Sequence, residues 1–216
     1  TTLNASDLQL ERFLEADLVK NAKELPLANK TPSTVLLTGA NGFLGHILCL
    51  DWMKTLSQNN GKVICIVRAK DNAAAYQRLA KEFVGTDKDL EEQFSTLAKK
   101  HLEVLAGDIS KPLLGLNSSD FNRLATQVDR ICHPAALVNH RLGYEHLFGP
   151  NVAGTAAIIR LALTNHKKTI DFVSTVAVER FLNTKQVNNE DSPLLDSITL
   201  TDHYAAGYGA SKWGAE

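Results

Sequence analysis

Short apolar runs alternate with amphipathic segments from residue 34 onward. Runs with strand character, rich in Val, Ile and Leu, occupy residues 34–37, 62–67, 102–105, 130–133 and 170–173. Segments with helical periodicity lie between them, at residues 43–56, 72–83, 90–100, 118–125 and 151–163. Parallel strands joined by helices need right-handed crossovers, and they form a sheet covered by helices on both faces. The pattern therefore predicts an α/β fold with a doubly wound parallel sheet.

Residues 6–23 have the pattern of an amphipathic helix that precedes the alternating region. Ser6 and Gln9 have capping-box spacing, and the apolar residues that share one face are Leu10, Phe13, Leu14 and Leu18. Pro26 and the stretch 29–32 then predict a linker. We expect residues 1–32 to be a helix and linker ahead of one domain at 33–216, with the helix either packed on the sheet or joining domains. The polar stretch 181–203, with Pro193, predicts a long loop near a site.

Bulk properties exclude several classes of partner. The chain has 216 residues, 44% hydrophobic and 22% charged, and a formal net charge of −1. This balance gives no electrostatic reason to bind nucleic acid or an anionic membrane, and no apolar run approaches the roughly 18 residues of a membrane helix. Cys49, Cys65 and Cys132 lie in apolar stretches and indicate reduced core residues of a cytoplasmic protein. We expect no metal site, because His133 and His140 flank a strand end where packing or hydrogen bonding suits them better.

A glycine-rich turn follows the first strand of the alternating region and precedes a helix. It contains Thr38, Gly39, Asn41, Gly42, Phe43, Leu44 and Gly45. In this context Gly39 permits a tight turn, Gly42 lets the backbone approach a pyrophosphate, and Gly45 allows close packing of helix on strand. The N-terminus of the helix supplies unpaired N–H groups for the anion. This arrangement predicts a Rossmann-type dinucleotide site, and the missing P-loop lysine disfavours ATP or GTP hydrolysis.

The residues at the following strand ends indicate which dinucleotide binds. Arg68 stands where an NAD site usually places Asp or Glu, and its guanidinium suits a 2′-phosphate, with Arg78 as a second partner. NADPH is therefore the predicted cofactor. After the third strand, Asp108 and Ile109 are expected to edge the adenine. After the fourth, the small residues Ala135 and Ala136 let the cofactor pass close to the backbone.

A Tyr-x-x-x-Lys spacing near the end of the chain supplies the predicted chemistry. Tyr208 and Lys212 share a helix face, so the ammonium would favour phenolate and make Tyr208 a better acid or base near neutral pH. Lys212 would also bind the nicotinamide ribose. A hydroxyl after the fifth strand, from Thr175 or alternatively Ser174, would join Tyr208 in stabilising an oxyanion. Asn151 is expected to open a helix, either holding a water in a proton relay or capping that helix.

Together these residues resemble the extended short-chain dehydrogenase/reductases. The strings at residues 34–45, 101–108, 134–140, 147–151 and 208–213 resemble the terminal reductase (thioester reductase) domain of bacterial carboxylic acid reductases. The resemblance implies an upstream adenylation domain and an acyl or peptidyl carrier domain in the same polypeptide. It also implies that NADPH reduces an acyl thioester on the carrier's phosphopantetheine to an aldehyde. The implied roles are Thr175 as oxyanion donor, Tyr208 as acid and Lys212 as its electrostatic partner.

The resemblance also carries one departure and several alternatives. Extended reductases continue past the Tyr-x-x-x-Lys helix into a C-terminal substrate-binding lobe, whereas this sequence stops four residues after Lys212. We therefore expect a Rossmann domain truncated before that lobe, inactive or weakly active by itself. The alternatives are a fatty acyl-CoA reductase, a peptide-synthetase terminal thioester reductase, a nucleotide-sugar epimerase and a non-catalytic cofactor sensor. Arg68 argues against the epimerase, and the presence of both Tyr208 and Lys212 argues against the sensor.

Overall fold

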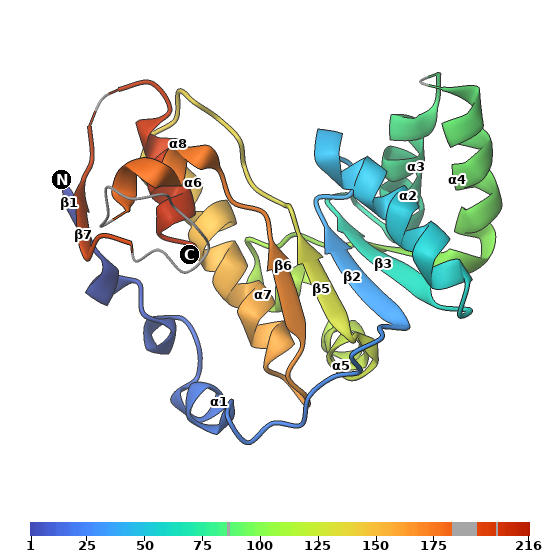
Figure 1. The fold of residues 1–216 in the computed structure, drawn as a ribbon, viewed down its shortest axis with the longest axis horizontal. Coiled ribbons are helices and arrows are strands. Elements are labelled where there is room, and N and C mark those ends of the chain that lie inside the picture. The colour runs from blue at the N-terminus through green and yellow to red at the C-terminus, as the bar shows by residue number, and fades with distance from the viewer. Residues whose placement is uncertain (86, 183–193, 202) are drawn as a thin grey trace.

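A five-stranded parallel sheet forms the centre of the computed structural model, which describes residues 1–85, 87–182, 194–201 and 203–216 (Figure 1). The strands are Thr34–Thr38 (β2), Lys62–Val67 (β3), Leu102–Ala106 (β4), Arg130–His133 (β5) and Thr169–Phe172 (β6). Their order across the sheet is β4-β3-β2-β5-β6. The predicted parallel α/β sheet is confirmed, and each strand lies within one residue of its predicted bounds.

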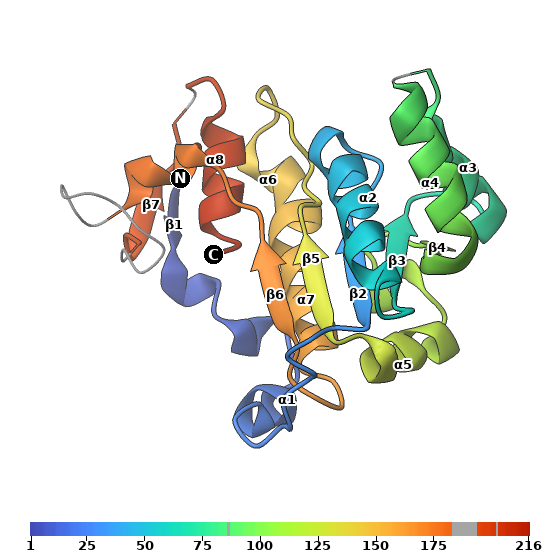
Figure 2. The same ribbon diagram turned by 45° about the vertical axis from the view of Figure 1, so that its right-hand side comes forward.

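Helices cover both faces of this sheet, as Figure 2 shows from a second side. One face packs against Phe43–Ser57 (α2), Asn72–Ala80 (α3), the 3-10 turn Lys81–Phe83 (η3) and Lys88–His101 (α4). The other face packs against Ser118–Gln127 (α5), Gly154–Ala162 (α7) and the turn Pro112–Gly115 (η4). The molecule is therefore a three-layer α/β/α arrangement, as predicted.

Burial on both faces explains why the strands have nearly continuous apolar sequences. In β2, Val35 and Leu37 belong to the cluster of α2, α3 and α4. Leu36 points the other way and belongs to the cluster of α5 and α7. All three side chains are fully buried. Because successive side chains alternate between faces, each strand contributes to two cores, which fixes its register.

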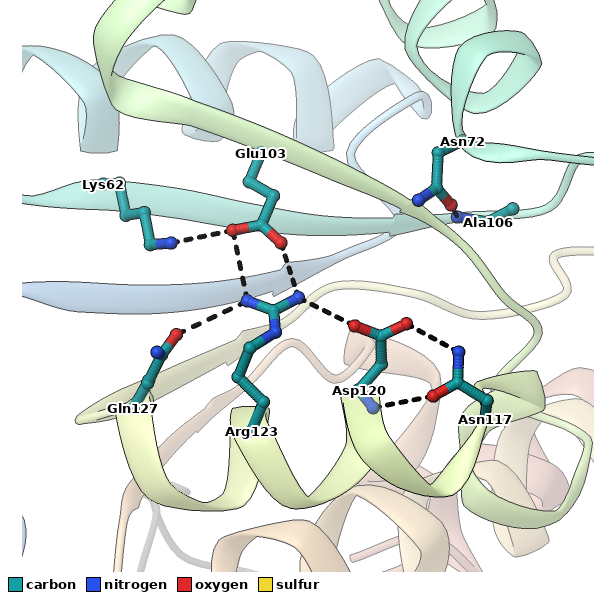
Figure 3. Close-up of polar contacts among 8 residues, drawn as sticks. All are labelled: Lys62, Asn72, Glu103, Ala106, Asn117, Asp120, Arg123 and Gln127. Atoms are coloured by element: carbon teal, nitrogen blue, oxygen red, sulfur yellow. Dashed lines mark hydrogen bonds and ion pairs between the residues drawn. The ribbon is translucent and has the colours of Figure 1, made fainter.

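A network of charged side chains joins α5 to the edge of the sheet (Figure 3). Glu103 on β4 accepts from Lys62 of β3 at 2.7 Å and from Arg123 of α5 at 2.6 Å, and Arg123 also contacts Asp120 at 3.0 Å. Burial opposes the charge of Glu103, but the bonds from Arg123 and Lys62 outweigh it and lower the pKa of this carboxyl. The Asn117 side chain accepts from the backbone N–H of Asp120 and begins the helix.

The single N-terminal helix predicted over residues 6–23 is wrong. The chain instead forms a short strand Thr2–Asn4 (β1), 3-10 turns Ala5–Asp7 (η1) and Leu10–Arg12 (η2), and a helix Ala16–Asn21 (α1). Gln9 and Glu15 adopt extended backbone angles that interrupt the helix, and no side chain caps η1. Tertiary contacts outweigh the local helical pattern here. β1 pairs antiparallel with Ser197–Thr199 (β7), and the Leu14 side chain is buried. The domain division at residue 32 stays a prediction.

The remaining elements lie beside the sheet next to β6 (Figure 1). They are the helix Tyr144–Leu147 (α6), the π-helical turn Phe148–Ala153 (η5), the 3-10 helix Val176–Phe181 (η6) and the helix Ala206–Trp213 (α8). Of the predicted loop over 181–203, residues 183–193 and 202 lie outside the described residues, and the described part contains β7. No helix within the described ranges has the length and apolar character needed to span a membrane.

Candidate active site

The strand order reverses between β2 and β5, and this is where an open parallel sheet holds its ligand. β2 runs into Gly39 and β5 runs into Pro134, so the two loops diverge from neighbouring strands. A Cβ added at Gly39 would lie 2.8 Å from Cα of Ala135, which measures how closely the two backbones approach. The predicted dinucleotide site therefore lies at the expected edge of the sheet.

The glycine-rich turn has the geometry that a phosphate site needs. Gly39 has a φ of +62°, a left-handed conformation that L side chains rarely adopt. A Cβ at Gly45 would lie 1.9 Å from the carbonyl oxygen of Gly39, so helix α2 can pack on the turn only without a side chain there. Gly42 precedes the first residue of α2 and brings no capping side chain, which leaves the first-turn N–H groups for an anion. These features fit the pyrophosphate of a dinucleotide.

One cleft of about 470 Å³ gathers most of the predicted site residues. The predicted residues that line it are Gly39, Asn41, Gly42, Phe43, Leu44, Gly45, Arg68, Asp108, Ile109, Ala135, Ala136, Ser174 and Tyr208. The glycine-rich turn of residues 39–45, called the phosphate loop below, thus faces the same space as the strand ends and Tyr208, the predicted acid. Sequence reasoning missed Val173, Leu137 and Val138, which also line this cleft, since nothing in their residue types marks a site.

Thr38 and Lys212 lie outside the lining of this cleft and are buried beside it. The Thr38 hydroxyl contacts His133, as described below. The Lys212 ammonium donates to the carbonyl of Val173 at 2.8 Å and lies 3.8 Å from the centre of the Phe172 ring. Burial lowers the pKa of Lys212 to about 8. A carbonyl bond and an aromatic face thus hold this ammonium at the end of β6.

Arg78 and Thr175 also lie outside the lining. Arg78 donates to the backbone carbonyl of Arg68 at 2.7 Å, which places its guanidinium at the end of β3. The Thr175 hydroxyl accepts from the N–H of Ala177 at 3.3 Å and begins the 3-10 helix η6. Ser174, the alternative hydroxyl, does line the cleft and donates to the Glu216 carboxylate.

Two opposite charges, Asp108 and Arg68, influence each other where the adenine end of the cofactor was predicted. Asp108 accepts from the Ser110 hydroxyl at 2.7 Å and from its N–H at 3.0 Å. Burial raises the pKa of Asp108, but these two bonds and the charges of Arg68 and Lys111 outweigh it and lower that pKa overall. Asp108 is therefore an anion at neutral pH, and Arg68 is an exposed cation near it.

Burial raises the pKa of the Tyr208 hydroxyl above its ordinary value, which favours the protonated phenol at neutral pH. Its ring makes an edge contact with His140, with centroids 5.5 Å apart. The sequence predicted that Lys212 favours the phenolate, which would lower the pKa of Tyr208. The pKa is raised instead. A phenol that keeps its proton suits an acid, which is the role that reduction of a carbonyl requires.

Asn151 does not open a helix, contrary to prediction, because it lies inside the π-helical turn that continues into α7. Pro150 lacks an N–H and interrupts regular α-helical bonding at this point. The Asn151 side chain accepts from the N–H of Leu137 at 2.7 Å and donates to the Leu137 carbonyl and the Ser211 hydroxyl. Both of its N–H donors are used, so Asn151 neither caps a helix nor has an amide proton left for a water relay.

The hydrogen-bonding role expected of His133 is confirmed. Its ring contacts the Thr38 hydroxyl at 2.6 Å and the Thr155 hydroxyl at 3.2 Å. Thr155 and Ser211 were not singled out from the sequence. Thr155 lies four residues after the string at 147–151, and Ser211 lies within the string at 208–213. The described residues contain no cluster of His, Cys, Asp or Glu that could hold a metal ion.

This strand order, with a glycine turn at its reversal point and Tyr-x-x-x-Lys beside the same cleft, defines a Rossmann-type dinucleotide-binding domain of the short-chain dehydrogenase/reductase kind. Residues 37–216 match the NAD-binding family described as male sterility protein, and the chain belongs to that family.

Several proteins of known activity are similar to the whole chain. It is 47% identical over 219 residues to a carboxylic acid reductase of Segniliparus rugosus and 44% identical over 218 residues to one of Mycobacterium marinum. Each match covers the whole of this chain. It covers only 18% of the length of the first relative and 19% of the second. A crystal structure of the reductase domain of a nonribosomal peptide synthetase from Mycobacterium tuberculosis superposes with a TM-score of 0.88 at 42% identity. The chain spans 50% of that structure.

Proposed function

We propose that this chain forms the cofactor-binding and catalytic part of a reductase that converts a carrier-bound acyl thioester to an aldehyde with NADPH. The observation that carries the proposal is the shared cleft, in which the phosphate loop, Arg68 and Tyr208 face one space. The similarity to carboxylic acid reductases and to a peptide-synthetase reductase domain supports the thioester as substrate.

The residues of the chain suit each part of this chemistry. NADPH, when bound, supplies a hydride for the carbonyl carbon of the thioester. Tyr208 then gives its proton to the carbonyl oxygen, and the resulting thiohemiacetal returns a proton to sulfur as the carbon–sulfur bond breaks. The products are an aldehyde and the free phosphopantetheine thiol. Lys212, four residues after Tyr208 on α8, is our proposed electrostatic partner for the phenolate that this transfer leaves, and in the structure its ammonium binds the Val173 carbonyl.

Thr175 is our proposed oxyanion donor, with Ser174 as the alternative. Thr175 is an acceptor toward the Ala177 N–H, so its own proton remains for a substrate oxygen. Ser174 spends its proton on the Glu216 carboxylate. The position of Ser174 in the lining of the cleft is the observation in favour of the alternative.

Partners and location follow from the same proposal. The curated relatives are about five times longer than this chain, which leaves room for other domains in one polypeptide. We infer that an adenylation domain activates the acid and that a carrier domain presents the acyl group on phosphopantetheine. The thiols Cys49, Cys65 and Cys132 are free and buried, which suits the reducing cytoplasm.

Purified full-length protein that contains this chain tests the function directly. With NADPH and an acyl pantetheine thioester, we expect loss of reduced-cofactor absorbance matched by aldehyde, which a hydrazone-forming reagent captures. An acyl-CoA and a nucleotide sugar are the comparison substrates. Oxidation of NADPH with either of them, and none with the pantetheine thioester, would contradict the proposal.

Arg68 should set the preference for NADPH over NADH. We expect Arg68→Gln to weaken NADPH binding by about 10- to 100-fold, because a charge-assisted bond to the 2′-phosphate contributes roughly 1.5–3 kcal/mol. NADH affinity should not fall. Lys70→Gln removes a cation two residues away on the same turn and serves as the matched control. Equal losses for both cofactors would show that Arg68 does not read the phosphate.

A further inference from the structure

A chain of buried polar side chains runs from the end of β2 to α8. The Thr38 hydroxyl lies 2.6 Å from Nδ1 of His133, and Nε2 of that ring lies 3.2 Å from the Thr155 hydroxyl. Thr155 donates to the backbone carbonyl of Asn151 at 2.7 Å, and the Asn151 amide donates to the Ser211 hydroxyl at 2.9 Å. None of these five residues is more than 5% exposed. Polar groups so deeply buried depend on one another for partners.

The donor and acceptor roles along this hydrogen-bonded chain are mutually consistent. Thr155 has a single hydroxyl proton and gives it to the Asn151 carbonyl, so toward His133 it can only accept. Nε2 of His133 therefore carries the ring proton, and Nδ1 is a bare acceptor for the Thr38 hydroxyl. The Thr38 oxygen in turn accepts from the N–H of Ala135 at 3.4 Å. Burial, helped by the charge of Lys212, lowers the pKa of His133 to about 3, which keeps the ring neutral.

The Thr38 end of this hydrogen-bonded chain lies at the two strand ends beside the proposed dinucleotide site. Thr38 immediately precedes the left-handed Gly39 of the phosphate loop, and His133 lies on β5 just before the loop of Ala135. β2 and β5 are neighbours in the sheet. Thr38 and His133 thus bridge the two strand ends from which the facing loops diverge, and the Ala135 N–H bond to Thr38 closes that bridge.

The Ser211 end of the hydrogen-bonded chain lies on α8, the helix that carries Tyr208, the proposed acid. Asn151 holds both the N–H and the carbonyl of Leu137, a residue of the cleft lining. Ser211, which receives the Asn151 amide proton, gives its own proton to the backbone carbonyl of Tyr208 at 2.8 Å. The π-helical turn brings Asn151 to a position between the Leu137 loop and α8.

We propose that His133, as the neutral Nε2–H tautomer, is a positioning residue for the reduction. It sets the spacing of the two loops that grip the dinucleotide and links that spacing to the placement of Tyr208 on α8. His133 itself does not line the cleft, and it acts through Thr38 on one side and through Thr155 and Asn151 on the other. This inference rests on the proposed function only for the catalytic readout, since cofactor binding reports on the Thr38 side independently.

Threonine-to-valine changes in the full-length protein test the two sides of the chain. Thr155→Val removes the acceptor for His133 at nearly constant shape, and we expect kcat for thioester reduction to fall about tenfold. Thr38→Val removes the donor for Nδ1, and the dissociation constant of NADPH, measured by its fluorescence, should rise about tenfold. Thr155→Ser and Thr38→Ser keep the hydroxyls and should restore each value toward wild type.

Thr164→Val is the matched control for the chain. The Thr164 hydroxyl also donates to the carbonyl four residues earlier, that of Arg160, but it belongs to the far end of the same helical region. A purely structural role for these hydroxyls predicts that Thr155→Val and Thr164→Val lower the melting temperature alike, with kcat per folded molecule unchanged. That result would overturn the proposal.

The two valine variants also separate failure of this proposal from misfolding of one variant and from failure of the proposed function. If Thr155→Val does not fold, Thr38→Val decides alone, and an NADPH affinity equal to that of Thr38→Ser overturns the proposal. If wild-type protein binds NADPH but reduces no thioester, the proposed function fails. The Thr38 pair still tests the positioning role in that case.

Discussion

Tyr208→Phe is expected to lower kcat for thioester reduction by about 10²- to 10⁴-fold, the usual contribution of a positioned acid. The substitution removes one oxygen and leaves the ring contact with His140 in place. The raised pKa keeps the phenol protonated at neutral pH, so the wild-type residue is ready to donate. Steady-state kinetics with NADPH and a pantetheine thioester measure the loss, and NADPH fluorescence should show unchanged cofactor binding.

Tyr144→Phe is the control for this experiment. Tyr144 lies on α6, outside the lining of the cleft, and burial raises the pKa of its hydroxyl to about 12. Loss of that hydroxyl should leave kcat near the wild-type value. Near-wild-type turnover from Tyr208→Phe, or equal losses in both variants, would remove Tyr208 from the role of acid.

Gly45→Ala is expected to damage both stability and cofactor binding. The new Cβ would lie 1.9 Å from the carbonyl oxygen of Gly39 and 2.7 Å from its carbonyl carbon. These are backbone atoms of the phosphate loop, so relief requires α2 or the loop to shift. We expect the free energy of unfolding to fall by about 3 kcal/mol, the upper part of the usual range for overpacking. NADPH binding should be lost with the loop geometry, as denaturant unfolding and fluorescence titration can show.

Gly149→Ala offers the same chemical change in open space. A Cβ at Gly149 meets nothing within 4 Å beyond its two chain neighbours. Alanine is favoured over glycine in helical backbone by up to about 1 kcal/mol, and the crowding of a Cβ before Pro150 opposes this gain. We expect the stability of this variant to stay close to that of wild type, with normal NADPH binding. If Gly45→Ala behaves in the same way, the close packing of α2 on the phosphate loop is not what shapes the site.

The sequence indicated much of the candidate site because strand ends determine where its parts meet. Gly39, Arg68, Asp108 and Ala135 each follow a different strand, and parallel strands direct their carboxyl ends to one edge. Their convergence in one cleft thus follows from the fold class alone. The partner of each side chain did not follow. Lys212 contacts the Val173 carbonyl, and Thr175 caps η6, because these contacts depend on packing between distant elements.

By itself, the sequence determined the α/β class, the bounds of the five parallel strands and the place of the dinucleotide cleft. Local patterns suffice there, since apolar runs buried on both faces and a glycine turn between strand and helix identify themselves. Only the tertiary structure decided that the N-terminal segment breaks into short turns and pairs with β7, and that Asn151 lies within a helix. It alone joined Thr38 to His133 across 95 residues, because a hydrogen bond depends on distance in space and leaves no periodic trace in the chain.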